Sequence, residues 1–236
     1  DNYPYKSFEF FLQSNSSYFD YIFISRCDQC HKYRKVIRKY SPYSKLIYIT
    51  HDINHLRIED DKEIVKNREL ENIKYCDLSL IVSKDEIHYL NNLVPKEKIF
   101  YYPILFTSSN LIRLPIKDTK DIYFIGSNHT PNIEALENFL ENIWTLVNKK
   151  NKNIIFHIIG KAGLEIRKFY NNVKIYGNLD KNDLGYLLSR VRLSIIPLLT
   201  GAGTKGKILE AMNNNIPIIS SNIGIQGLSL KDTLDF

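Results

Sequence analysis

Short apolar runs alternate with amphipathic helical segments through the second half of the chain, and this alternation limits the fold more than any other feature. The apolar runs occupy residues 121–126, 154–160, 173–177, 192–199 and 216–220. Segments with apolar residues at helical spacing lie between them, at 131–150, 164–170, 181–191 and 204–214. Strands that are apolar throughout and separated by helices are typical of a parallel sheet covered on both faces. The sequence therefore predicts a doubly wound α/β domain over residues 121–236.

The first half repeats this alternation less regularly. Apolar runs lie at 19–25, 45–50, 77–83 and 98–102, with helical segments at 63–76 and 84–93. Residues 106–120 contain Pro115, lack periodicity and are predicted to be a linker. We therefore expect a first doubly wound domain over residues 1–105. It opens on a helical segment, 7–19, without a preceding strand and glycine-rich turn, so we expect it to be incomplete and the chain to be a fragment or a shortened form.

Composition limits the partners and the compartment. The 32 Lys and Arg residues exceed the 26 Asp and Glu residues, which gives a net charge of +6 and favours an anionic partner. Three classes of partner fit this charge: a phosphorylated small molecule, a nucleic acid and an acidic membrane surface. No apolar run is long enough to span a bilayer, and the amino terminus does not resemble a secretory signal. A cytoplasmic protein is predicted.

Three cysteines raise the question of a haem or a metal site. Cys27, Cys30 and His31 spell C-x-x-C-H, the pattern of c-type haem attachment. That chemistry requires export, and no export signal is seen. Cys76 has no neighbouring Cys or His that would complete a zinc site. We therefore expect a strand-to-helix turn that carries two thiols, and no metal site.

The segment 201–208, GAGTKGKI, resembles a nucleotide triphosphatase loop with one departure. Gly201, Gly206 and Lys207 fit G-x-x-x-x-G-K-[ST], but Ile208 stands where a hydroxyl should bind magnesium. The loop also follows a late strand of its domain, and no strand that ends in a lone Asp follows it. The triphosphatase interpretation is therefore disfavoured.

The same loop still predicts a phosphate site. Three glycines allow main-chain N–H groups to approach an anion, and Thr204 is expected to cap the following helix. Lys205 and Lys207 in the first turn oppose the helix dipole unless an anion lies between them. The alternative is a solvated basic turn.

Several segments resemble family-4 glycosyltransferases. Residues 201–228 resemble the family's donor-binding segment, which often reads G-G-T-R-x-K-x-L-E-A-M, then P-V-V, then G-x-x-G. Residues 123–147 and 173–198 resemble the first strand, loop and helix of its carboxy-terminal domain and its base-reading loop. In the first half, 49–57 (ITHDINHLR) and 80–86 (LIVSKDE) resemble HD-x-x-x-L-R and S-x-x-E. The resemblance implies the glycosyltransferase B architecture, with two Rossmann-like domains that face each other across a cleft.

The resemblance also implies a donor site for a nucleoside diphosphate-sugar. Glu210 would accept hydrogen bonds from the ribose hydroxyls, while Lys205 and Lys207 would neutralise the diphosphate. A surface pair between Glu210 and Lys207 is the alternative. Main-chain groups would contact the phosphates and the base, from Gly126, Ser127, Gly177, Asn178, Leu179, Gly203 and Thr204. For the loops at 126–127 and 177–179, the alternative is an ordinary strand-ending turn.

On the acceptor side, the resemblance places His51 beside the transferred sugar, so that His51, Lys207 and Glu210 are the expected catalytic residues. Weaker candidates are Asp52, Arg57, Ser83 and Glu86. A capping box would equally explain the spacing of Ser83 and Glu86.

Two departures from the family pattern bear on activity. Many members carry Glu at the position of Ala202, and the Arg and Lys that often follow the first-strand glycine are absent from 128–132. Lys205 and Lys207 are thus left to bind phosphate. These departures permit a second interpretation, a non-catalytic nucleotide-sugar-binding module.

The segment 31–40, HKYRKVIRKY, has two interpretations. Five cations surround an apolar helical stripe, as in helices that lie against anionic lipid head groups. The alternative is a helix docked on its sheet with a solvated basic face.

These observations predict a retaining, hexosyltransferase-like glycosyltransferase of polysaccharide biosynthesis. It would move a sugar from a nucleoside diphosphate donor to a saccharide or lipid-linked acceptor, in the cytoplasm and at the inner face of the membrane. No cofactor is expected, and the lack of a D-x-D motif predicts that no metal is needed. Nucleic acid is not an expected partner, because no binding motif is found and the charge is spread along the chain.

Overall fold

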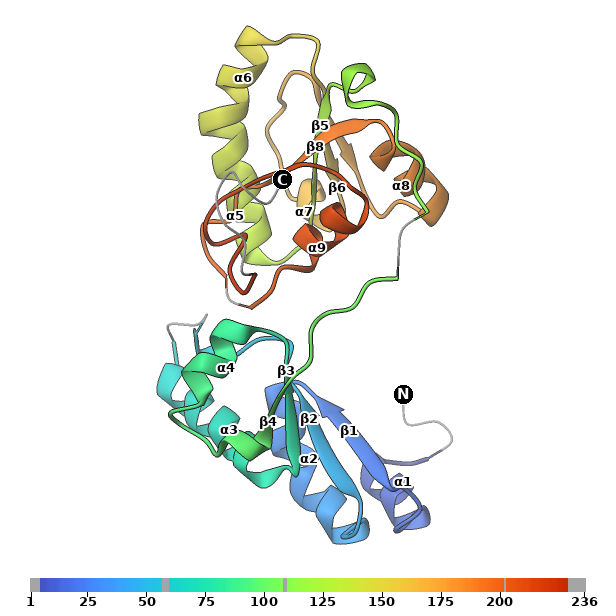
Figure 1. The fold of residues 1–236 in the computed structure, drawn as a ribbon, viewed down its shortest axis with the longest axis vertical. Helices are drawn as coiled ribbons and strands as arrows, with labels where there is room; N and C mark the ends of the chain where they lie inside the picture. Colours follow the sequence, from blue (N-terminus) through green and yellow to red (C-terminus); the bar gives the residue numbers. More distant parts are fainter. Residues whose placement is uncertain (1–4, 57–59, 108–109, 202, 229–236) are drawn as a thin grey trace. The chain divides into compact units, whose positions relative to one another are not determined.

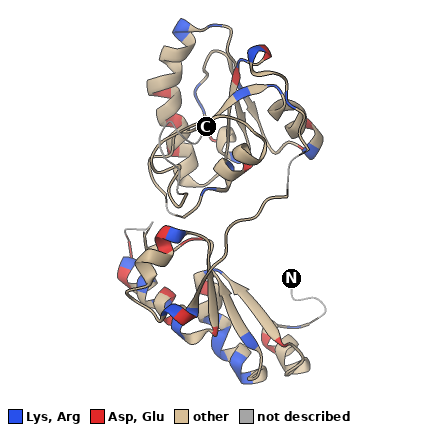
Figure 2. Cartoon of the chain, viewed as in Figure 1, with Lys and Arg blue, Asp and Glu red and all other residues tan. Residues whose placement is uncertain are grey.

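The computed structural model describes residues 5–56, 60–107, 110–201 and 203–228. The chain divides after Ile104 into two α/β units (Figure 1), and Gly203 and Thr204 group with the first of them. Lys and Arg residues are interspersed with Asp and Glu over both units (Figure 2). In the described part of the chain, no helix combines the length and apolar character that crossing a bilayer requires.

The first unit contains a four-stranded parallel sheet whose strands follow chain order. The strands are β1 (Tyr21–Ser25), β2 (Lys45–Ile49), β3 (Leu78–Ile81) and β4 (Ile99–Tyr101). The helices are α1 (Phe8–Ser14), α2 (Cys27–Tyr40), α3 (Lys62–Tyr75) and α4 (Lys84–Leu90), with 3₁₀ turns η1 (Asn54–Leu56) and η2 (Lys96–Lys98).

The core of the first unit lies on one face of this sheet. Leu46 and Tyr48 of β2 are buried in one cluster with Ile37 of α2 and Ile73 of α3. Successive strand residues point to opposite faces, and the other face carries Tyr21 and Phe23, which are 63% and 58% exposed. Because the strand order does not reverse, right-handed crossovers place the connecting helices on one face.

The second unit contains a five-stranded parallel sheet in the order β7-β6-β5-β8-β9. Its strands are β5 (Asp121–Ile125), β6 (Phe156–Ile159), β7 (Val173–Tyr176), β8 (Val191–Ile196) and β9 (Ile218–Ser220). Its helices are α5 (Thr130–Phe139), α6 (Thr145–Lys150), α7 (Lys161–Leu164), α8 (Lys181–Leu188) and α9 (Gly206–Asn213). A π turn, η4 (Leu140–Trp144), joins α5 to α6, and a 3₁₀ turn, η3 (Ile116–Asp118), precedes β5.

This second sheet is doubly wound, as the alternation of runs predicts. After β7 the chain crosses to the other side of β5, so the order reverses between β5 and β8. Neighbouring residues of β5 then enter different cores: Tyr123 packs with Leu188 and Ile208, whereas Phe124 packs with Trp144 and Phe156. In such sheets, ligands bind at the carboxyl ends of the strands beside this reversal.

The segment expected to be a linker makes hydrogen bonds within the second unit. Leu114 donates its main-chain N–H to the carbonyl of Ser189 at 2.9 Å. Arg113 donates to the carbonyl of Val191 at 2.7 Å and to that of Asn215. These contacts attach the segment to the start of β8 and to the residues that follow α8 and α9.

The helix expected near 164–170 was misplaced. The helix of this region, α7, spans Lys161–Leu164 and directly follows β6. Gly160 has φ +92°, a conformation that side chains disfavour, and this lets the chain turn from the strand into the helix at once. Sequence periodicity could not show this turn.

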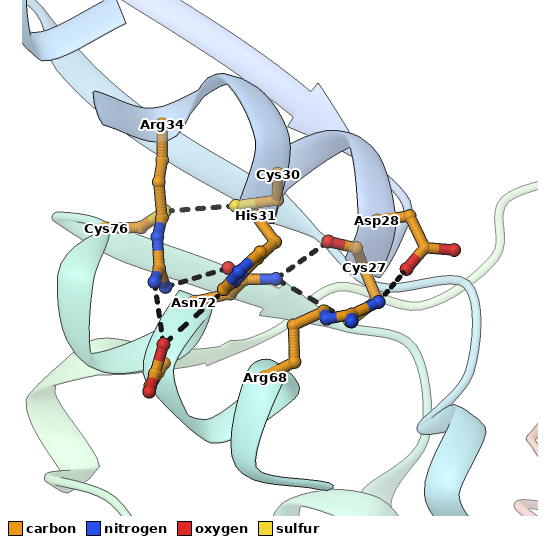
Figure 3. A network of polar contacts seen from close by, with 9 residues as sticks. Cys27, Asp28, Cys30, His31, Arg34, Arg68, Asn72 and Cys76 are labelled. Atoms are coloured by element: carbon orange, nitrogen blue, oxygen red, sulfur yellow. Dashed lines mark hydrogen bonds and ion pairs between the residues drawn. The ribbon is translucent and has the colours of Figure 1, made fainter. Parts of the chain in front are cut away.

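The C-x-x-C segment is also placed differently from the prediction, because its thiols lie within α2 rather than in a turn before it (Figure 3). Cys27, Cys30 and Cys76 are buried free thiols, and the Cys30 and Cys76 Sγ atoms lie 3.7 Å apart. Burial, with Glu69 and Asp28 nearby, raises the pKa of Cys27 to about 12. Contact with Cys76 and burial likewise raise the pKa of Cys30. Among the described residues, no three His, Cys, Asp or Glu side chains are arranged to hold a metal ion.

The basic helix α2 uses two of its cations inside its own unit, and Figure 3 shows the contacts of one of them, Arg34. The Arg34 guanidinium is buried and donates to Asn72 at 2.9 Å and to Glu71 at 2.7 Å. Arg38 donates to the Asp77 carboxylate at 2.8 Å. These bonds support the docked-helix interpretation.

Candidate functional site

A cavity of about 610 Å³ lies in the second unit, at the carboxyl edge of its sheet. It is lined by the ends of β5 and β6, by the loops that follow β5, β6 and β7, and by residues of α5, α7, α8 and α9. Six of the residues predicted for donor binding line it: Gly126, Ser127, Asn178, Leu179, Lys207 and Glu210. The structure therefore gathers residues that lie as much as 84 positions apart in the sequence, from Gly126 to Glu210, around one hollow.

Lys207 lies in the first turn of α9 and contacts residues of β5 and of the first turn of α5. The helix begins at Gly206 with Lys205 as its N-cap, so the prediction that Thr204 caps it was wrong. The Lys207 ammonium donates to Asn132 Oδ1 at 2.6 Å and lies 4.3 Å from the centre of the Phe124 ring. Burial and the nearby Lys205 lower the pKa of Lys207 to about 7.

Glu210 lies one turn after Lys207 on α9. It is half-buried, and this burial raises the pKa of its carboxyl group. The Lys207 ammonium is bound by Asn132 rather than by Glu210. Two partly buried, opposite charges on one helix face are therefore directed to the same cavity.

Glycines bring the loops after β5 and β6 into direct contact. A Cβ atom on Gly160 would lie 2.4 Å from the Gly126 carbonyl oxygen. That carbonyl accepts a hydrogen bond from the main-chain N–H of Ala162 at 3.1 Å. The close approach shapes the floor of the cavity and requires glycine at position 160.

Sequence reasoning missed seven lining residues: Ile125, Asn128, Asn132, Ile159, Gly160, Lys161 and Leu184. Lys161 follows the glycine that ends β6, so its place at the edge of a predicted parallel sheet was a usable signal. Asn132 lies in the first turn of a predicted helix that follows a strand-ending glycine. Nothing in the sequence distinguishes Leu184 from other apolar residues of α8.

Other predicted donor residues lie outside this group. Gly177 and Lys205 are not among the described residues that line the cavity. The Gly177 carbonyl accepts a hydrogen bond from Gly160 at 3.1 Å, so it supports the neighbouring loop. Gly203 and Thr204 group with the first unit.

In the first unit, His51 and Asp52 follow β2, at the carboxyl edge of the sheet where they were expected. His51 is exposed. Ser83 is the N-cap of α4 and accepts from the N–H of Glu86 at 3.5 Å, which is one half of a capping box. The Glu86 carboxylate instead accepts the main-chain N–H of Ile53 at 2.9 Å. Arg57 lies outside the described residues.

A second buried carboxylate, Glu69 of α3, holds the same turn. It accepts the main-chain N–H groups of Asn54 at 2.8 Å and His55 at 3.2 Å. It also lies 2.6 Å from His55 Nδ1, while His55 Nε2 lies 2.9 Å from the Tyr89 hydroxyl. His55, to which the sequence assigned no role, thus belongs to a buried network that fixes the chain just after His51.

Comparison with known proteins decides the family. Residues 119–232, which include every element around the cavity, match the family model described as glycosyl transferases group 1. Residues 119–232 thus belong to the glycosyl transferase group 1 family. The chain is also 29% identical over 117 residues to an uncharacterized 44.6 kDa protein in the cps region of Klebsiella pneumoniae. That match covers 45% of this chain and 30% of the relative.

Solved structures confirm the fold of the chain. TarM of S. aureus matches with a TM-score of 0.69 at 15% identity, over 92% of this chain and 44% of TarM. Sucrose-phosphate synthase of Thermosynechococcus elongatus matches with the same TM-score and identity, over 92% of this chain and 60% of the synthase. HepE of Anabaena, in complex with UDP and glucose, matches with a TM-score of 0.63 at 14% identity, over 91% of this chain and 62% of HepE. The two parallel α/β units thus have the glycosyltransferase B fold, over part of the length of these proteins.

Proposed function

We propose that the cavity of the second unit binds a nucleoside diphosphate-sugar and that the chain is part of a retaining glycosyltransferase. The acceptor would be a saccharide or a lipid-linked sugar. The arrangement of Lys207 and Glu210 carries this proposal: a cation and a carboxylate, one turn apart on α9, line one cavity with the Gly126–Ser127 loop. In a nucleoside diphosphate, the diphosphate needs a cation, and the neighbouring ribose hydroxyls need an acceptor such as a carboxylate.

The phosphate side rests on three features of the cavity. The amino end of α9 favours an anion, and the Lys207 ammonium lies in its first turn. Lys161, at the start of α7, adds a second cation to the lining. Negative charge grows on the diphosphate as its bond to the sugar breaks, so fixed positive groups here lower the barrier to transfer.

The nucleoside side rests on Glu210 and on the loop after β7. A carboxylate accepts two hydrogen bonds and therefore suits the paired hydroxyls of ribose. Asn178 and Leu179 line the same cavity and present main-chain groups for the base. HepE, a structural neighbour, was crystallised with UDP and glucose, which supports UDP as the first ligand to test.

We further propose that donor binding needs no metal, because lysines and the helix dipole provide the positive charge. This is tested with UDP in EDTA. Unchanged affinity supports the proposal, and loss of binding that manganese or magnesium restores contradicts it.

For His51 we propose a role beside the transferred sugar. His51→Ala should then lower sugar transfer while UDP affinity stays within about twofold, since the donor nucleotide is held by the second unit. Full activity in this variant would exclude the role. Asp52 and Ser83 stay weaker candidates, and the buried contact of Glu86 with Ile53 favours a supporting role for that carboxylate.

The biological setting is proposed from a relative. The Klebsiella protein is encoded in a cps region, which supports polysaccharide biosynthesis in the cytoplasm, at the inner face of the membrane. The exposed lysines of α2 would provide peripheral contact with anionic lipid.

Calorimetric titration tests the donor site. UDP, GDP and ADP are titrated into the chain and into Glu210→Gln, with uridine as a ligand that lacks phosphate. The Gln variant should bind UDP and uridine more weakly by similar factors, about five- to tenfold, because ribose is common to both. Equal UDP binding by the two proteins would remove Glu210 from the site. Nucleotide binding without sugar transfer by the full-length protein would select the non-catalytic module.

A further inference from the structure

We propose that Asn132 is a positioning residue that joins Lys207 to the Ser127 loop, so that the cation and the loop meet the donor phosphates as one unit. This inference rests on the proposed function, because it concerns how the same cavity holds a diphosphate. Asn132 belongs to neither the predicted donor loops nor the catalytic residues expected from the family resemblance.

Asn132 lies in the first turn of α5, between the two parts of the site. Its Nδ2 donates to the Ser127 carbonyl at 2.9 Å and lies 3.4 Å from the Ser127 hydroxyl. Its Oδ1 accepts from the Lys207 ammonium at 2.6 Å. One side chain therefore connects the loop after β5 to the first turn of α9.

The chemistry of these partners requires an amide at position 132. A lysine ammonium can only donate, and a main-chain carbonyl can only accept. The orientation of the Asn132 amide is fixed by this difference, with its oxygen toward Lys207 and its nitrogen toward Ser127. A carboxylate at this position would keep the contact with Lys207 and lose the hydrogen bond to Ser127, while alanine would lose both contacts.

Neighbouring side chains restrict the position of the Lys207 ammonium. The Phe124 ring lies on one side of Lys207, 4.3 Å from ring centre to Nζ. A Cβ atom at position 126 would lie 2.6 Å from that ring and 3.1 Å from Asn132 Cγ, so glycine there leaves room for both neighbours. The Asn132 bond uses one of the three ammonium donors and leaves the others for a ligand.

Three variants test the link by UDP titration: Asn132→Ala, Lys207→Ala and the double variant. At pH 8 we expect Asn132→Ala to weaken UDP binding about tenfold, through loss of a charge-assisted hydrogen bond. If Asn132 acts through Lys207, the same substitution should have little further effect in the Lys207→Ala background. Additive losses would overturn the inference.

The pH dependence of UDP affinity separates positioning from a merely structural role. An acceptor that binds the charged form of an amine favours that form, so its loss should move the fall in affinity to lower pH in Asn132→Ala. Asn132→Asp, which retains volume, places a carboxylate beside Lys207 and should move the fall to higher pH. The Lys207→Ala profile serves as the baseline, because it contains only the titration of UDP itself. Identical profiles for the wild type and both Asn132 variants would contradict the proposal.

Asn142→Ala is the matched control, since it removes an exposed amide of η4 outside the cavity and should leave UDP affinity unchanged. Thermal unfolding of each variant checks the fold, and Asn132→Asp keeps the test open if Asn132→Ala does not fold. If Lys207→Ala itself leaves UDP binding unchanged, the proposed function fails. If Lys207→Ala weakens binding and neither Asn132 variant does so, only the positioning role fails.

Discussion

At the scale of single residues, the least common feature of this chain is a lysine whose charge is marginal at neutral pH. Burial lowers the pKa of Lys207 to about 7, so above that pH the ligand-free protein carries mostly the neutral amine. A bound diphosphate favours the charged form and raises the pKa. The site thus accepts a proton together with its ligand.

This linkage predicts proton uptake on UDP binding at pH 8, approaching about 0.9 proton per ligand for a pKa near 7. At this pH the terminal phosphate of UDP is already ionised and contributes no uptake. Calorimetry in buffers with different ionisation enthalpies measures the number directly. Lys207→Ala should abolish the uptake, and uridine should not cause it. Binding heats that are independent of the buffer would refute the assignment.

Lys161 should contribute less to UDP binding than Lys207, since Lys161 is exposed at the rim of the cavity. Lys161→Ala should weaken UDP binding about two- to fivefold, and the effect should shrink in high salt because exposed charges are screened. Lys150→Ala, an exposed lysine at the end of α6, is the control. Equal losses in the two variants would show that only net charge matters.

At the scale of elements, contacts between neighbouring loops set the site. Gly160→Ala should destabilise the second unit by about 1–3 kcal/mol, because φ there is +92° and a Cβ would clash with the Gly126 carbonyl. Gly206→Ala is the matched substitution, since a Cβ there meets nothing within 4 Å and alanine favours a helix. It should leave stability unchanged or raise it slightly. Denaturant unfolding measures both, and equal behaviour would contradict the account.

The turn after β2 depends on buried carboxylates in a similar way. Glu69→Ala would leave the N–H groups of Asn54 and His55 and the His55 ring without their acceptor. Removal of one partner from such a buried network typically costs about 3–5 kcal/mol. Hydrogen exchange should then accelerate at residues 53–55 far more than in α9. Protection that stays unchanged at 53–55 would show that Glu69 does not hold the turn.

The sequence predicted elements well where one physical rule decides them. All nine strands of the described residues lie within predicted apolar runs or start one residue before them, because a buried parallel strand must be apolar throughout. Two of the errors, the bounds of α7 and the place of the α2 thiols, fall where local backbone geometry decides. The left-handed conformation of Gly160 and that of Arg26, φ +69° at the start of α2, leave no trace in periodicity.

At the scale of the whole molecule, the site shows the same difference between features that local sequence rules predict and features that only the three-dimensional structure reveals. That Lys207 and Glu210 share one face of α9 was predictable, because spacing along a helix gives the face. The partnership of Asn132 with Lys207 joins residues 75 positions apart and required coordinates. That the two units act together in sugar transfer stays a prediction, and the His51→Ala variant tests it.

The most direct test of the central claim compares UDP with uridine in Lys207→Ala. A charge-assisted bond to the diphosphate is worth about 1.5–3 kcal/mol, so the substitution should weaken UDP binding about ten- to more than a hundredfold. Uridine binding should change by less than about threefold, because uridine has no phosphate to lose. Equal effects on the two ligands, or no effect on either, would contradict a diphosphate site at the start of α9.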